Sequence, residues 1–148
     1  MTTKRTIKVK KYSDNIIELV ANAAITPGMV VEQMSTDFIR AHSTEDGNCL
    51  PMIALEDELQ GKIISEAYAQ NDPVQVWIPA RGDEFYGILA SGESVAKGAF
   101  LVSNGDGKLK ALPVLASTGD VFTTQIIGVA TEAINAALAD ARIIVRVI

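Results

Sequence analysis

Apolar and polar residues alternate with a period of two over much of the chain, and turn residues separate the alternating stretches. Near the start, Ile7 and Val9 fall on one face of such a stretch and the neighbouring lysines on the other. The pattern predicts an all-β fold, a compact β-barrel or β-sandwich with at most one or two short helices. The predicted strands cover residues 7–11, 16–21, 29–34, 38–41, 51–56, 74–78, 84–89, 100–102, 108–112, 126–130 and 142–148.

Two segments depart from this alternation. Between residues 56 and 69, apolar residues fall near helical spacing, but Gly61 interrupts them, which favours one short helix. Residues 133–141 are rich in alanine and fit two helical turns or a loop equally well. The stretch 103–107 contains Asn-Gly and Asp-Gly pairs and predicts a hairpin turn.

The chain also contains a weak internal repeat. Residues 25–31 resemble residues 95–101 when the two are aligned on their central glycines, and each is followed later by a strand ending near an acid, at 53–56 and 129–132. This predicts two related β units packed on one core. The alternative is that any β protein repeats a turn, a glycine and a strand.

Composition excludes several kinds of site. Hydrophobic residues make up 48% and charged residues 21% of the chain, which is typical of globular proteins. No apolar run approaches the ~20 residues of a membrane span, and no signal-peptide stretch follows the first five residues. One cysteine, Cys49, excludes an internal disulfide, and one histidine, His42, argues against a histidine-clustered metal site. We expect His42 at a strand end and Cys49 as a small, partly buried residue.

Charge is unevenly distributed along the chain. Residues 1–11 carry a charge of +5, from Lys4, Arg5, Lys8, Lys10 and Lys11, and contain no acid. The remaining residues carry eight basic and eighteen acidic side chains, and the whole chain has a net charge of −5. A basic segment on an acidic body can bind nucleic acid, anionic lipid or an acidic protein surface, or it can be a frayed terminus. The acidic body and the lack of stacking aromatic residues argue against nucleic acid.

Acidic residues cluster at 45–46, 56–58 and 83–84. Paired carboxylates can perform acid–base chemistry or hold a cation, but at turns and strand ends we expect them to be solvated. Residues 81–83 spell the Arg-Gly-Asp tripeptide associated with integrin attachment, and residues 104–107 resemble a fragment of a calcium loop; we interpret both as turns. Phosphate-binding glycine motifs are absent. We expect no enzymatic activity, no cofactor and no metal.

A β-rich chain without an active site is most often an interaction module. Four aromatic residues, Trp77, Phe85, Tyr86 and Phe100, are predicted to lie in the core. One or two of them are alternatively anchors for a subunit interface.

An ordered set of strand and turn pieces resembles the decoration, or cement, proteins of tailed-bacteriophage and prophage capsids. The resemblance spans residues 24–133 and departs from the group in the alanine-rich segment and the basic segment. The resembling pieces are residues 24–32, 53–56, 67–76, 82–83, 89–90, 95–101, 105–107 and 127–133.

The resemblance implies a small β-rich protein that binds the outside of an expanded icosahedral head and clamps adjacent major-capsid subunits. It implies a homotrimer with the major capsid protein as partner, without contact to nucleic acid or membrane. The protein would lie on the outer capsid surface of the virion, and in the host cytoplasm during assembly. The group has no catalytic residues to carry over.

We expect two parts, a basic N-terminal arm at 1–15 and a single β-rich decoration domain at 16–148. The arm would lie on the acidic capsid face or add a strand to an exposed edge. Its predicted capsid-binding residues are Lys4, Arg5, Ile7, Lys8, Val9, Lys10 and Lys11. Deletion of residues 1–11 is then expected to leave a folded protein that no longer decorates capsids.

Two other functions remain open from the residues alone. A β-barrel binding module for a small ligand or glycan would need an apolar pocket of several hundred Å³ with convergent polar groups. An enzyme would need one of the carboxylates at 56–58 or at 83–84 to be buried, perturbed and facing a cleft.

Overall fold

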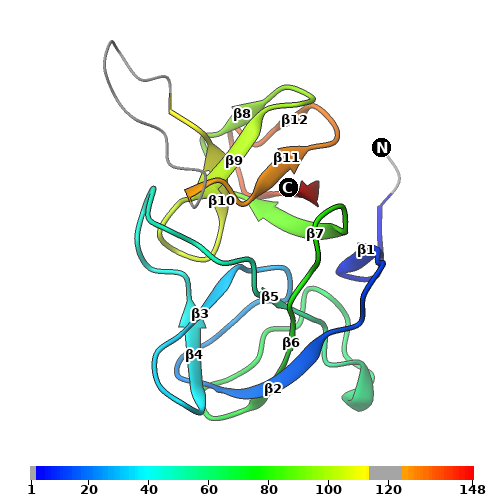
Figure 1. Ribbon diagram of the computed structural model, residues 1–148, viewed down its shortest axis with the longest axis vertical. Coiled ribbons are helices and arrows are strands. Elements are labelled where there is room, and N and C mark those ends of the chain that lie inside the picture. Colours follow the sequence, from blue (N-terminus) through cyan, green and yellow to red (C-terminus); the bar gives the residue numbers. More distant parts are fainter. Residues whose placement is uncertain (1–2, 114–124) are drawn as a thin grey trace.

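The computed structural model describes residues 3–113 and 125–148 and is almost entirely β (Figure 1). One short 3₁₀ helix, η1 (Glu58–Gln60), is present in these ranges. The all-β prediction is confirmed. The strands are β1 (Lys8–Lys10), β2 (Ile16–Ala21), β3 (Val31–Gln33), β4 (Phe38–Ala41), β5 (Ile53–Ala54), β6 (Pro73–Trp77), β7 (Glu84–Leu89), β8 (Ser94–Val95), β9 (Phe100–Ser103), β10 (Leu109–Ala111), β11 (Gly128–Ala130), β12 (Ile134–Asn135) and β13 (Ala141–Val147).

Five strands of the C-terminal half close into a barrel, in the order β7-β10-β9-β11-β13 and back to β7. The β7–β10 pair is parallel, and the other four pairs are antiparallel. Closure removes the unpaired sheet edges that would otherwise favour aggregation. Strand β1 pairs with the part of β7 that β10 leaves uncovered, with Lys8 opposite Phe85.

The N-terminal half forms a second circle of five strands. Its sheet has the order β3-β4-β2-β6-β5, with β2–β4 parallel and the other pairs antiparallel. An isolated antiparallel bridge between Val30 and Ile53 joins β3 to β5 and closes the circle. We call β2–β6 the first barrel and β7, β9, β10, β11 and β13 the second barrel; they occupy the lower and upper halves of Figure 1.

The predicted pair of related β units is confirmed, because the two barrels share one topology, but the expectation that both pack on one core is wrong, since each barrel has its own apolar cluster. Strands β2 to β6 correspond in order to β7, β9, β10, β11 and β13, with the same parallel pair and the same antiparallel pairs. Individual hydrogen bonds recur as well. Gly28 N donates to Ala54 O at 2.7 Å, and Gly98 N donates to Ala130 O at 2.8 Å.

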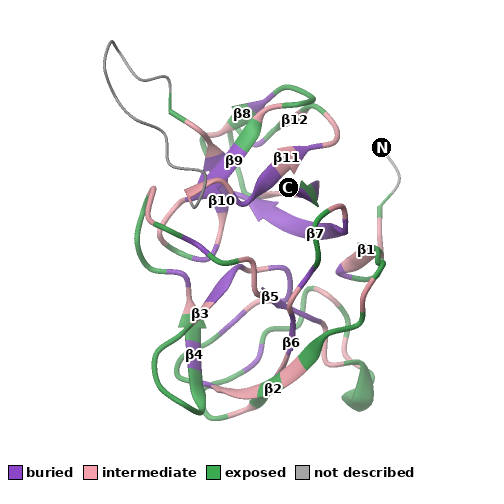
Figure 2. Ribbon diagram, in the orientation of Figure 1, coloured by how far each residue is buried: buried purple, intermediate pink, exposed green. Residues whose placement is uncertain are grey.

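The two barrels have separate but adjoining apolar cores (Figure 2). One cluster lies within the first barrel and includes Ile39 and Val74. The larger cluster fills the second barrel and also takes in Val30, Ile53 and Trp77 from the first. Burying these side chains supplies about 25 cal/mol per Å² of apolar surface removed from water, which is the main stabilising term. The larger cluster therefore also holds the two halves together.

Phe100 departs from the predicted core. Trp77, Phe85 and Tyr86 are buried as predicted, whereas Phe100 is 46% exposed, because it takes an outward position in β9 while its neighbour Leu101 points inward. The one short helix predicted within 56–69 is confirmed as η1, which Gly61 ends in a left-handed conformation at φ 70°.

The alanine-rich segment 133–141, for which two helical turns or a loop fitted equally well, forms no helix. It contributes β12, whose Ile134 lies opposite Val95 of β8, and then continues as a loop. The pairing with a strand forty residues earlier explains why local composition did not indicate it.

Candidate functional site

The basic N-terminal segment is the site that the sequence predicted, and the structure places most of it against the body of the protein. Ile7 is fully buried and belongs to the larger core cluster. Its carbonyl accepts a hydrogen bond from Tyr86 N at 2.8 Å, and its own N–H donates to a carboxylate oxygen of Glu56 at 3.1 Å. Ile7 therefore anchors the segment through both side chain and backbone.

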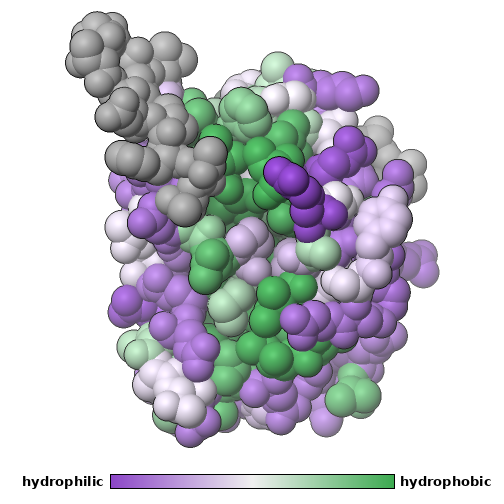
Figure 3. Space-filling view, viewed as in Figure 1, coloured by the Kyte–Doolittle hydropathy of each residue, from purple (hydrophilic) through white to green (hydrophobic). Residues whose placement is uncertain are grey.

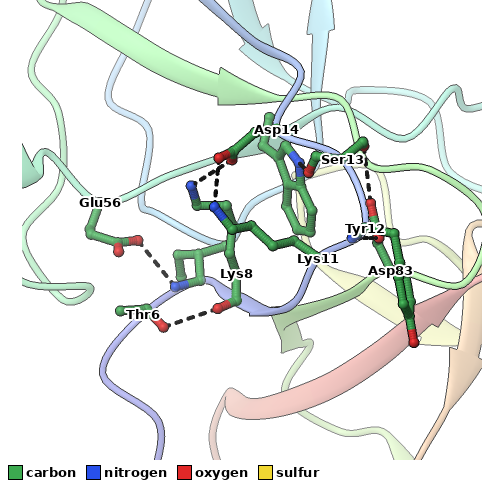
Figure 4. A network of polar contacts seen from close by, with 10 residues as sticks. Thr6, Lys8, Lys11, Tyr12, Ser13, Asp14, Glu56 and Asp83 are labelled. Atoms are coloured by element: carbon green, nitrogen blue, oxygen red, sulfur yellow. Dashed lines mark hydrogen bonds and ion pairs between the residues drawn. The ribbon is translucent and has the colours of Figure 1, made fainter.

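The lysines that follow are partly engaged within the segment (Figure 4). Lys8 Nζ lies 3.1 Å from Asp14 Oδ1, and Lys11 Nζ contacts the other oxygen of the same carboxylate. The hydrogen bonds from Lys11 and then Lys8 lower the pKa of Asp14. All of these groups are accessible to water, so the pairs are weak. Lys10 does not join these pairs, and its Nζ lies 3.8 Å from Glu84 Oε2.

The Asp83 carboxylate fixes the end of the segment. Asp83 is fully buried and accepts hydrogen bonds from Tyr12 N at 2.6 Å, Ala80 N at 2.7 Å and the Ser13 hydroxyl at 3.4 Å (Figure 4). Next to it, the indole Nε1 of Trp77 donates to Ser13 O at 3.3 Å. A buried carboxylate is stable here because backbone N–H groups replace its hydration.

These contacts correct two expectations. From Ile7 onward the segment is not the expected extended arm but a strand and a loop bound to the second barrel, since Ile7 gains burial and β1 gains backbone hydrogen bonds. Deleting residues 1–11 would remove the core side chain of Ile7, so we expect the deletion to lower the stability of the fold as well; the deletion itself stays a prediction. Lys4 is half-buried, Arg5 is exposed, and Val9 packs against the core from a partly buried position. Residues 1–2 of the predicted arm lie outside the described residues.

The acidic pair at 83–84 was predicted to be solvated, and this is wrong. Asp83 is held as described, and Glu84 is buried between Lys10 and Arg146, whose nitrogens each lie 3.8 Å from one of its oxygens. The turn interpretation of the Arg-Gly-Asp tripeptide is confirmed, with Gly82 at φ 93°. Because Asp83 is buried, its carboxylate is not available to an external receptor.

The other predicted polar sites are also built into the fold. Glu45 and Asp46 bind Lys110 of β10 at 2.6 and 3.2 Å, which ties a loop of the first barrel to the second. His42 follows β4, as predicted, and is buried with Nδ1 2.6 Å from the Ser103 hydroxyl. Cys49 is 5% exposed, more buried than expected, and burial raises the pKa of its thiol to about 12.

Sequence analysis missed Arg142, a structural cation at the junction of the barrels. Its guanidinium donates to Pro27 O at 2.7 Å, Ile64 O at 2.9 Å and Tyr86 O at 3.3 Å. Burial lowers its pKa from the ordinary value. The signal available in the sequence was a single arginine at the start of the strongly apolar last strand.

Several hollows among the described residues are open to the surface. One of about 170 Å³ is lined by Lys8, Ile16 and Leu59 among others, and one of about 310 Å³ lies beside Gly98. In the described ranges, no group of three or more His, Cys, Asp or Glu residues could hold a metal ion. No helix among the described residues is long and apolar enough to cross a membrane. The barrel interiors are filled with apolar side chains.

Comparison with known proteins gives a fold but no family. No protein-family model matches the chain. No curated protein matches it either. Among solved structures, the chain is similar to the N base of the head fiber gp8.5 of bacteriophage phi29, with a TM-score of 0.58 and 12% sequence identity. The match covers 92% of this chain and 95% of that one, so the two share the whole double-barrel architecture.

Proposed function

We propose that the chain is a structural protein of a tailed-phage head. In this role it binds the outside of the expanded shell and stabilises it by clamping adjacent major-capsid subunits, as a decoration or cement protein does. Its place is the outer surface of the virion, after assembly in the host cytoplasm, and its oligomeric form is a homotrimer.

The observation that carries this proposal is the likeness of nearly the full chain to the base of a phage head fiber. At 12% identity that likeness is one of fold, and the function of the neighbour is transferred here as part of the proposal. A second support is independent of it, since the ordered strand and turn pieces at 24–133 resemble decoration proteins. The filled barrels and the structurally engaged carboxylates also favour adhesion over chemistry.

The mechanism follows from mass action. A ligand that binds only the assembled, expanded lattice stabilises it by RT ln(1 + [L]/Kd) at each site, which is about 2.7 kcal/mol at one hundred times Kd. Many copies on one head multiply this term, and linked copies in a trimer raise the effective affinity further. A clamp of this kind opposes the internal pressure of packaged DNA without touching the DNA.

The test is co-sedimentation of the purified chain with empty expanded heads of the phage that encodes it, together with the solution mass of the free protein. Saturable binding to expanded heads, weaker binding to unexpanded precursors and a higher melting temperature of decorated heads are expected. Absence of binding, or heads that are equally stable with and without the protein, would contradict the proposal. A monomeric mass would contradict the homotrimer alone.

A further inference from the structure

The outer wall of the second barrel presents a row of side chains across four neighbouring strands. In register, Glu84 of β7 lies opposite Arg146 of β13, Arg146 opposite Val129 of β11, and Val129 opposite Phe100 of β9. Alternation directs the flanking residues inward, so these four share one face. Phe100 is 46% exposed, Val129 is half-buried and the Arg146 side chain is 55% exposed. The row therefore joins an exposed aromatic ring, an aliphatic side chain and a guanidinium.

Basic groups surround this row. Lys10 and Arg146 approach Glu84 from two sides, at 3.8 Å each, which is beyond hydrogen-bond distance. Within the described residues, one Glu84 oxygen, Oε2, accepts no hydrogen bond. Lys97 lines the same hollow as Arg146 and Val129. Two cations, Lys10 and Arg146, flank the Glu84 carboxylate, and a third, Lys97, lines the hollow beside Arg146, so basic side chains outnumber this carboxylate on a chain whose net charge is −5.

The hollow beside this row lies at the turn that contains Gly98. It measures about 310 Å³ and is lined by Lys97, Gly98, Val129, Ala130, Thr131 and Arg146. Among the described residues, a Cβ added at Gly98 would meet nothing within 4 Å, whereas one at the equivalent Gly28 would meet Arg142 and Tyr86. Within this part of the chain, the first-barrel turn is thus covered and the second-barrel turn is not.

We propose that this face, named here the Phe100–Arg146 face, is a docking surface for an acidic protein surface with an apolar centre. The proposal rests on the proposed function, in which that partner surface belongs to the shell. Phe100 and Val129 supply the apolar contact, and Arg146 and Lys97 pair with partner carboxylates at its border. Figure 3 shows apolar side chains gathered over β9 and β11, with strongly hydrophilic side chains beside them.

The chemistry of the face selects this partner. Aromatic residues and arginine are the side chains that contribute most to protein–protein affinity, and arginine binds a carboxylate with two parallel hydrogen bonds. The guanidinium of Arg146 lies 3.8 Å from Glu84, too far for a hydrogen bond, so its N–H groups can donate to a partner carboxylate. The positive charge complements an acidic partner and would speed its association at low salt.

The experiment measures binding to empty expanded heads for the variants Arg146→Glu, Lys97→Glu and Phe100→Ser. Matched controls are Lys62→Glu, with the same charge change in the loop after η1, and Phe38→Ser, a phenylalanine 37% exposed on the first barrel. Each face variant is expected to weaken binding about tenfold or more, as hot-spot truncations do, with controls near wild type. Thermal melting checks the fold, and Lys97→Glu, at an exposed position, keeps the test valid if Phe100→Ser is unstable.

The outcomes separate the two proposals. Wild-type binding with all three face variants unchanged overturns the Phe100–Arg146 face and leaves the proposed function standing. No binding by the wild type overturns the proposed function and, with it, this partner. Variants that change the solution mass while keeping full affinity for heads show that the face contacts a second copy, which also overturns the inference.

Discussion

Replacing Ile7 by alanine tests whether the basic segment is part of the folded body. Ile7 is fully buried, and its Cδ1 lies near the Gly28 turn, where the two barrels meet. Truncating a buried isoleucine to alanine costs about 2–5 kcal/mol, from lost transfer energy and the cavity left behind. A chain of this size loses about 3 °C of melting temperature per kcal/mol, so a fall of about 6–15 °C is expected.

Urea unfolding followed by the fluorescence of Trp77, the single tryptophan, provides the measurement. Trp77 is buried and donates to Ser13 O just after the segment, so its emission reports on the contact as well as on the fold. Ile16→Ala is the matched control, because Ile16 is 37% exposed and should cost less than about 1 kcal/mol. If Ile7→Ala costs no more than Ile16→Ala, the segment is detached in solution and the reasoning is wrong.

Three further results are expected. Gly28→Ala should destabilise the protein more than Gly98→Ala in thermal melts, because both glycines have positive φ but only Gly28 would also clash; equal losses would contradict the asymmetry. Cys49, with its pKa raised to about 12, should react with a thiol reagent at pH 8 only after unfolding; rapid labelling of the native protein would contradict its burial. The hydrogen bond from Lys108 lowers the pKa of Asp140, so this pair stabilises the fold above the ordinary carboxyl pKa and loses that contribution as pH falls through the lowered value. An NMR titration should find the Asp140 pKa higher in Lys108→Met, and an unchanged value would refute the pairing.

The sequence predicted the strands and turns that depend on a few neighbouring residues. The ranges of β2, β4 and β7 agree with the predicted ranges residue for residue. The hairpin at 103–107 and the internal repeat also followed from short stretches, because turn glycines and strand alternation are set within a few residues. The predicted fold class included a barrel. The sequence did not predict which strands pair with each other, since pairing depends on residues far apart in sequence.

The candidate site was harder to predict for the same reason. Acidic residues in a turn are usually solvated, but the Asp83 carboxylate binds Tyr12 N, which lies 71 positions earlier. The lysines that alternate with Ile7 and Val9 suggested a free arm. Instead, Ile7 packs into a core whose other residues come mainly from later strands. Phe100 was assigned to the core by its type, and its strand position, not its chemistry, makes it exposed.

The repeat explains why one local motif has two different roles in this chain. Gly28 and Gly98 have the same backbone bonds and similar φ angles, 93° and 87°, so the local sequence specifies the same turn twice. The surroundings of the two turns differ. Arg142 and Tyr86 of the second barrel lie against the Gly28 turn, whereas none of the described residues lies within 4 Å of a Cβ built at Gly98. A head-to-tail contact between two like units necessarily leaves one unit with an unused copy of the contact surface. That unused surface is the open hollow at Gly98, and the Phe100–Arg146 face that we propose for a shell partner lies beside it on the second barrel.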